Sequence, residues 1–338
     1  MSETRSFFAH PMAKWALFVV MLFVLWFGGW FVFSRYLDGQ IGQQISRLET
    51  RGVEIECQDR AMVGFPFRIG VLCARTAVSD PRRELLVQAG ELRTTAVVHD
   101  PTRIIAELKS PMIIQRGRAE LMADWSAMRL FVDGDLSGGF EIISLNGSAL
   151  KIAAGEAKVA MEKGDFHLRP NPVDTEALDV AFSTTQLTAN PTADVSIAPA
   201  TLSFNARMDD AYGQLVADRA PMASYLGGQG SALLRYFVLS TPNGGELAFS
   251  GPVTWHGDGT LSGEVTIGIA QAQAVGAWAA QINPDLEQAV AGIGQAVAGM
   301  GAKASFGSAE LPSVKVTIDK NAVKLGFITL TTLPKFGG

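Results

Sequence analysis

The chain has few of the residues that most metal and catalytic sites need. Four histidines and two cysteines occur among 338 residues, and no second histidine or cysteine lies within four residues of His99, His167 or His256. The Gly-x-Ser-x-Gly motif of serine hydrolases is absent. The segment 292–294 starts like a dinucleotide fingerprint but lacks its third glycine. We therefore expect no enzymatic activity, no metal and no cofactor, although catalytic groups can converge from distant positions.

Positive charge is also scarce and dispersed. The 28 lysines and arginines are outnumbered by 33 acidic residues, which gives a net charge of −5. No basic stripe runs along the chain, so the sequence indicates no nucleic-acid partner.

A long hydrophobic run is the strongest positive feature. Residues 15–33 carry no charge, and a helix over this run is about 28 Å long, close to the hydrocarbon core of a bilayer. A cleaved signal peptide is the alternative, but its apolar core is shorter and ends in small residues. The run predicts a single uncleaved anchor preceded by a cytoplasmic tail over residues 1–14. The aromatic side chains that we expect to hold it in the bilayer are Trp15, Phe23, Trp26, Trp30 and Phe33.

The lysines and arginines that flank the anchor do not decide its orientation, but the two cysteines bear on it. Val53, Ile55 and Cys57 share one face of an expected strand, and Ile69, Val71 and Cys73 share one face of the next. A returning hairpin would place the two sulfurs together. A disulfide requires an oxidising compartment, and the alternative is a pair of buried free thiols.

The remainder of the chain predicts a mainly β fold. Residues 34–52 form a helical exit from the membrane, with Gly52 at its end. Residues 53–338 form a β-rich periplasmic domain, built from long antiparallel, curved or partly open sheets with a few helices. A subdivision near residue 170 is the alternative to one continuous domain. The expected strands cover residues 92–99, 104–108, 112–115, 129–133, 140–145, 149–153, 157–162, 178–183 and 201–206.

Two hairpins and a helical region are expected near the C-terminal end. Residues 247–269 and 314–327 alternate apolar and polar side chains around turn signals. Residues 270–281 are alanine-rich, and an apolar stripe over 286–300 follows Asn283, a helix N-cap residue. This glycine-rich helix either packs against the sheet or acts as a mobile or membrane-touching element.

A compact motif lies between the two cysteines. Gly64, Phe65, Pro66, Phe67 and Arg68 combine a turn with two aromatic side chains. Such a turn is either a structural corner that caps the sheet or a rim that contacts lipid or a protein partner.

With this motif, the chain resembles an uncharacterised alphaproteobacterial family of membrane-anchored proteins. The resemblance rests on Cys57, residues 63–69, Cys73, the Gly-Asp-Gly hairpin at 257–259 and residues 323–330. It implies a periplasmic domain and no established activity. The layout is also distantly similar to AsmA-type envelope proteins, whose curved sheets have an apolar concave face implicated in lipid movement. That likeness is an analogy of fold and transfers function weakly.

These observations predict a protein of the bacterial inner membrane with one span and its C-terminal domain in the periplasm. We expect it to bind or shield lipid or another apolar envelope molecule. The alternative is a non-enzymatic envelope scaffold or assembly partner that binds other proteins.

Overall fold

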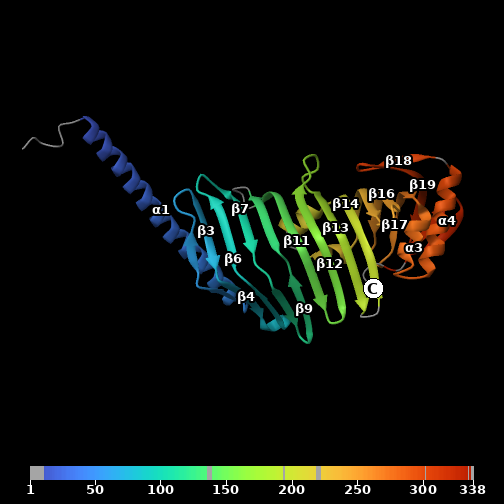
Figure 1. The fold of residues 1–338 in the computed structure, drawn as a ribbon, viewed down its shortest axis with the longest axis horizontal. Coiled ribbons are helices and arrows are strands. Elements are labelled where there is room, and N and C mark those ends of the chain that lie inside the picture. The colour runs from blue at the N-terminus through green and yellow to red at the C-terminus, as the bar shows by residue number, and fades with distance from the viewer. Residues whose placement is uncertain are drawn as a thin grey trace, which may run out of the picture.

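The computed structural model describes residues 11–134, 139–192, 195–217, 222–300, 302–333 and 335. A long helix stands at one end of an extended antiparallel sheet, and two shorter helices pack at the other end (Figure 1). The prediction of a mainly β fold with an N-terminal apolar helix is confirmed. Of the predicted cytoplasmic tail, residues 1–10 lie outside the described part of the chain.

The N-terminal helix α1 (Pro11–Glu49) passes without a break from the predicted anchor into the predicted exit segment. It ends where Gly52, at φ +84°, donates its amide hydrogen to the carbonyl of Glu49. The side chains of Ile41 and Ile45 are half-buried. Residues 34–49 of the predicted exit segment are thus the C-terminal part of one continuous helix.

The sheet starts as two branches. The first contains β2 (Ala61–Val63), β3 (Arg68–Cys73), β6 (Leu92–Val97), β7 (Asp100–Leu108) and β10 (Ala127–Gly134). The second contains β1 (Glu54–Gln58), β4 (Arg75–Asp80), β5 (Leu85–Ala89), β8 (Met112–Arg116) and β9 (Ala119–Asp124), and a 3-10 turn, η2 (Pro81–Arg83), joins β4 to β5. Both branches pair with the same strand, β11 (Phe140–Ala154), which unites them.

From β11 the chain continues mostly as an antiparallel meander. The strands that follow are β12 (Ala157–Pro170), β13 (Leu178–Thr192), β14 (Val195–Met208), β15 (Gly230–Ser240), β16 (Glu246–Trp255), β17 (Leu261–Ala270), β19 (Ala309–Asp319), β20 (Ala322–Leu325) and β21 (Ile328–Thr332). A short strand, β18 (Lys303–Phe306), pairs separately with β19. Strands β12 and β13 pair from Lys158 and Asn190 to Pro170 and Leu178, so the sheet is continuous on both sides of residue 170.

The separate strands predicted at 140–145 and 149–153 are one strand, β11. Ala149 has φ +51° in the middle of it, while pairing with β12 keeps one register on both sides. The apolar positions change from odd to even numbers there, from Leu145 to Leu150. The alternation of apolar and polar residues is therefore out of phase on the two sides of Ala149. In the sequence this pattern resembles a break between two strands.

Helices cover the last strands of the sheet. A π-helical turn, η3 (Gly213–Ala217), and α2 (Met222–Gly227) pack around Leu178 and Trp255. The predicted helical region contains α3 (Ala272–Ala279) and α4 (Asp285–Met300), and the Asn283 side chain accepts the Asp285 amide hydrogen as expected of an N-cap. Val290 and Val297 of α4 are buried in the largest core cluster with Ile267 and Val314. The glycine-rich helix is thus packed against the sheet.

Candidate functional site

A row of five phenylalanines crosses five neighbouring strands on one face of the sheet. Strand partners in register lie opposite each other, with their side chains on the same face. Phe166 pairs with Phe182, and Phe182 pairs with Phe204. Phe204 then pairs with Phe237, which pairs with Phe249. We call these five residues the phenylalanine row, and the sheet face that they occupy the apolar face.

The apolar face extends beyond the row in both directions. Toward the N-terminal strands, Phe166 pairs with Leu145, which pairs with Leu130. Toward the C-terminal strands, Phe249 pairs with Ile267, which pairs with Val314. The line of apolar side chains therefore runs without interruption from β10 to β19.

The opposite face of the same strands is polar. A second line of register partners runs across this face from β6 to β14. It consists of Arg93, Glu107, Arg129, Asn146, Asp165, Ser183 and Ser203. This line becomes apolar at Val238 and Ala248, where Phe306 of β18 packs over it. On this second line, the apolar side chains thus stand where another element of the protein covers them.

The core clusters of the described residues take in part of the apolar face. At its C-terminal end, α3 and α4 cover Phe249, Ile267 and Val314. The side chains of Phe166, Phe182, Phe204 and Phe237 are half-buried, and they belong to none of the three buried clusters found in the described residues. Four neighbouring aromatic rings therefore lie outside the buried core of the described residues and stay partly open to solvent.

At its other end the sheet meets α1 through the predicted Gly64–Arg68 motif. Phe65 lies 5.2 Å from Phe27 and 5.3 Å from Trp30, and Phe67 lies 6.0 Å from Trp26, between ring centroids. The two indole nitrogens also donate hydrogen bonds to main-chain carbonyls, Trp26 to Pro66 at 3.1 Å and Trp30 to Arg68 at 3.0 Å. The motif is thus brought onto the C-terminal part of the apolar run.

The motif is continuous with the apolar face. Phe67 is the last residue of the turn before β3, and Ile69 is the second residue of that strand. Ile69 pairs with Ala96, and Ala96 pairs with Ile104. Ile104 leads through Val132 and Ile143 to Leu168, two residues from Phe166. The apolar face therefore begins beside α1 and ends under α3 and α4.

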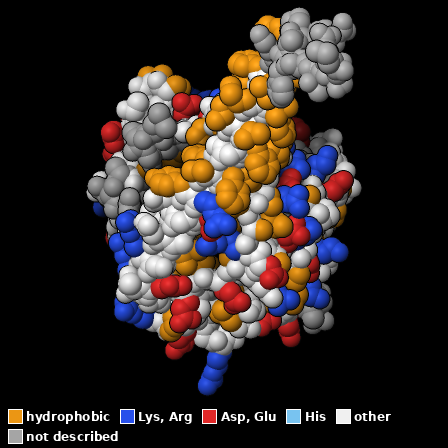
Figure 2. Space-filling view, turned by 90° about the vertical axis from the view of Figure 1, so that its left-hand side faces the viewer, with side chains coloured by type: hydrophobic (Ala, Val, Ile, Leu, Met, Phe, Trp, Pro, Cys, Tyr) orange, Lys and Arg blue, Asp and Glu red, His pale blue; other side chains and the backbone are white. Residues whose placement is uncertain are grey.

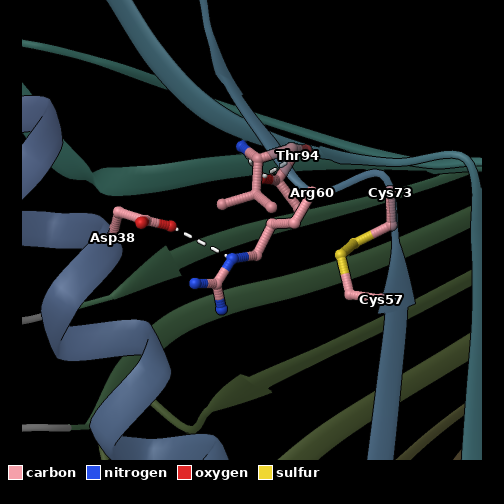
Figure 3. The surroundings of a disulfide bond; sticks show 6 residues. Asp38, Cys57, Arg60, Cys73 and Thr94 are labelled. Atoms are coloured by element: carbon pink, nitrogen blue, oxygen red, sulfur yellow. Dashed lines mark hydrogen bonds and ion pairs between the residues drawn. A yellow bond between two sulfur atoms is a disulfide. The ribbon is translucent and has the colours of Figure 1, made fainter.

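Cys57 and Cys73 form the predicted disulfide (Figure 3). The predicted hairpin between their strands is wrong: β1 pairs with β4, and β3 pairs with β2 and β6. Cys73 belongs to β3 of the first branch and Cys57 to β1 of the second, so the bridge joins the two branches of the sheet. Beside it, where β3 passes into β4, the amide of Ala74 donates a hydrogen bond to the carbonyl of Gln58. Nearby, Arg60 forms an ion pair with Asp38 of α1 at 3.0 Å.

Among the described residues, the N-terminal part of α1 makes no hydrogen bond or ring contact with the sheet. The residues from Trp15 to Leu25 are exposed, and α1 is the only helix in the described chain that is long and apolar enough to cross a membrane. Figure 2 views this end of the molecule, where the apolar side chains gather on α1 and charged side chains are scattered over the surface below it. Of the predicted anchor residues, Trp26 and Trp30 also contact the sheet.

Residues 30–334 match the family described as "Uncharacterized protein conserved in bacteria (DUF2125)". The chain belongs to this family. No curated protein and no solved structure matches the chain. The matched residues of this family member include the whole sheet, the disulfide and the Gly64–Arg68 motif.

The polar face of this DUF2125 member holds an ion cluster that the sequence analysis did not identify. The side chain of Asp179 is 6% exposed and accepts hydrogen bonds from Asn171 at 2.8 Å and Arg235 at 2.8 Å; Arg169 lies 3.3 Å away. Burial alone would raise the pKa of this carboxyl, but the hydrogen bonds from Asn171 and Arg235 outweigh it and hold the pKa below its usual value. Since Asp179 is fully paired, the cluster ties β12, β13 and β15 together.

The histidines do not assemble a catalytic centre in the described residues. Ser144 Oγ lies 2.8 Å from His167 Nδ1, and His256 Nε2 lies 3.1 Å from Ser262 Oγ. No carboxylate of the described chain hydrogen-bonds to either ring, so neither pair has the orienting third group of a catalytic triad. Among the same residues, no three histidine, cysteine or acidic side chains gather as metal ligands.

Proposed function

We propose that this protein is anchored in the bacterial inner membrane and binds the acyl chains of a lipid, or a similarly apolar envelope molecule, on the apolar face. The observation that carries the proposal is the phenylalanine row. Four of its rings are half-buried and belong to none of the buried clusters of the described residues, while the reverse side of β12, β13 and β14 carries the polar partners Asp165, Ser183 and Ser203.

The energetics favour an apolar occupant. Removing apolar surface from water stabilises a complex by roughly 25 cal/mol per Å², and a contiguous apolar patch on a protein surface is typical of a binding site. The five strands of the row span about 19 Å at the usual strand spacing. This exceeds the roughly 15 Å depth of hydrocarbon in one leaflet, so the row is long enough to accommodate one acyl chain.

The compartment follows from two features. α1 supplies a candidate span, and the Cys57–Cys73 disulfide fits an oxidising compartment, which in a bacterium is the periplasm. The sheet would then stand on the periplasmic side of the inner membrane. The distant similarity of layout to AsmA-type envelope proteins supports the same role by analogy.

A second function is favoured by a different surface. Phe327, between β20 and β21, is 97% exposed, and Ile328 and Leu330 on the last strand are 54% and 43% exposed. An apolar edge strand is a template for pairing with another chain. A scaffold or assembly role, with a protein partner on β21, is therefore the alternative to lipid binding.

Two matched variants test lipid binding. Phe182→Asp places a charge in the phenylalanine row, and Ser183→Asp places the same charge on the polar face of the same strand. Both keep α1 and the annular lipid around it. The full-length proteins are purified in one detergent, and their bound lipids are extracted and quantified per protein by mass spectrometry. We expect Phe182→Asp to lose a lipid that the wild type and Ser183→Asp retain; equal lipid content in all three would overturn the proposal.

A further inference from the structure

We propose that residues 64–68, which we call the Phe-Pro-Phe turn, are immersed in the hydrocarbon of the periplasmic leaflet, where the apolar face meets the bilayer. This inference rests on the proposed membrane anchorage of α1. It deepens the proposed function by placing the entrance for acyl chains beside α1, with the lipid bilayer as the partner of the turn.

The position of the contacts on α1 sets the depth of the turn. The apolar run covers residues 15–33, so its midpoint is residue 24. At 1.5 Å per residue, Trp26 lies about 3 Å and Trp30 about 9 Å from the bilayer midplane when the run is centred. Tilting the helix brings both residues closer to the midplane. The side chains that hold the turn are therefore within the hydrocarbon layer rather than at its surface.

The main chain of the turn is suited to that environment. A main-chain polar group without a partner in hydrocarbon costs several kcal/mol. The carbonyls of Pro66 and Arg68 accept hydrogen bonds from the indoles of Trp26 and Trp30. The Gly64 carbonyl accepts the amide hydrogen of Arg68 at 2.9 Å, and the Phe67 carbonyl accepts that of Val98 at 3.1 Å. Pro66 has no amide hydrogen to satisfy.

The exposure of the side chains of the turn also favours a position in hydrocarbon. Phe65 is 39% and Phe67 is 67% exposed, although both contact the aromatic face of α1. In water these rings would be an unfavourable exposed patch; in hydrocarbon they are solvated. Arg68, the first residue of β3, is exposed, and its long side chain can reach the headgroup phosphates from this depth.

A hollow with an almost wholly apolar lining adjoins the turn. It has a volume of about 150 Å³ and is lined by Leu25, Trp26, Gly29, Trp30, Phe33 and Val98. Val98 follows β6, where Ala96 belongs to the line that continues along the apolar face. The hollow thus lies between α1 and the start of the apolar face, which is the place for an acyl chain leaving the leaflet.

Site-directed spin labelling of the full-length protein measures the depth of the turn. Phe67→Cys is labelled without reductant, so that the Cys57–Cys73 disulfide stays intact, and reconstituted in phosphatidylcholine/phosphatidylglycerol vesicles. Accessibility to oxygen, which partitions into hydrocarbon, is compared with accessibility to a water-soluble nickel chelate. Val24→Cys marks the bilayer centre, and Phe327→Cys marks a phenylalanine that is 97% exposed at the far end of the sheet.

We expect the label at position 67 to match position 24, with high oxygen and low nickel accessibility, and Phe65→Cys to give the same result. A label at position 67 that matches position 327, in a protein whose disulfide is intact, would overturn the inference. Depth is measured whether or not lipid occupies the apolar face. If position 67 is not in hydrocarbon but Phe182→Asp loses its lipid, the immersion of the Phe-Pro-Phe turn is rejected and the proposed lipid binding is still supported.

Discussion

Trp30 in the middle of α1 donates its indole hydrogen to the carbonyl of Arg68 at the start of β3, across 38 residues of sequence. With the Trp26–Pro66 hydrogen bond and the Asp38–Arg60 ion pair, it fixes the helix to the first long strand of the sheet. α1, the candidate membrane span, is therefore packed against the domain rather than joined to it by a flexible linker. If α1 spans the membrane as proposed, this arrangement sets the angle between the sheet and the bilayer.

Replacing Trp30 by phenylalanine should loosen this junction. Trp30→Phe keeps the ring against Phe65 but removes the donor, and a hydrogen bond of this kind contributes about 1 kcal/mol. We expect amide hydrogen exchange over residues 64–69 to rise about fivefold, which is the rate factor that corresponds to that energy. Trp15→Phe, on the contact-free part of α1, is the control; equal exchange in the two variants would contradict the coupling.

The disulfide should make a measurable contribution to stability. Replacing both Cys57 and Cys73 by serine opens a closed loop with a sequence separation of 16 residues, and the chain-entropy model assigns about 3 kcal/mol to such a loop. Chemical unfolding of the full-length protein in detergent should show a loss of that order. Thiol labelling of the native protein without reductant should modify neither cysteine, and labelling of both would refute the bridge and weaken the periplasmic assignment.

Asp179 should make part of the stability dependent on pH. Asp179→Asn removes the charge that Arg235 and Arg169 face, and we expect it to destabilise the sheet by about 1–3 kcal/mol at neutral pH. Because the pKa of Asp179 is lowered in the folded protein, its contribution is fully present above the unfolded pKa of about 4. The contribution disappears as the pH falls through the lower, folded value.

The measurement for Asp179 is the midpoint of thermal unfolding at several pH values. The wild type should lead Asp179→Asn at pH 7, and the lead should shrink as the pH is lowered below 4. Asp165→Asn, on the same polar face in a pair with Asn146, is the control and should lose less. A lead for the wild type that stays constant down to pH 2 would show that the carboxylate charge is not what stabilises this cluster.

Local patterns in the sequence predicted several elements correctly. The alternation in 178–183 and the stripe at 286–300 reflect burial of one side of a strand and of a helix. The uncharged run at 15–33 is mostly exposed in the structure, and it predicts a helix because it is long and apolar enough to cross a membrane. The hairpin between the strands of Cys57 and Cys73 failed for the opposite reason. Alternation tells which face a residue occupies, and it contains no information about whether β3 or β4 is the partner of β1.

The candidate site depends on register, which the sequence does not display. The five phenylalanines of the row are separated by 16, 22, 33 and 12 residues, the differences between their positions in the sequence, and only the pairing of β12 through β16 aligns them. The contact between α1 and the Phe-Pro-Phe turn also joins distant segments. A signal was present, since two exposed aromatic residues at a turn require an apolar partner, but it did not identify Trp26 and Trp30 as that partner.

The most direct test of lipid binding on the apolar face is site-specific photocrosslinking in living cells. A photoreactive phenylalanine analogue is placed at position 182 in the phenylalanine row and, in a separate strain, at position 183 on the polar face. After irradiation, the intact mass of each purified protein is measured. We predict an adduct of lipid mass at position 182 and none at position 183. Protein adducts alone at position 182, or lipid adducts of equal yield at both positions, would contradict the account.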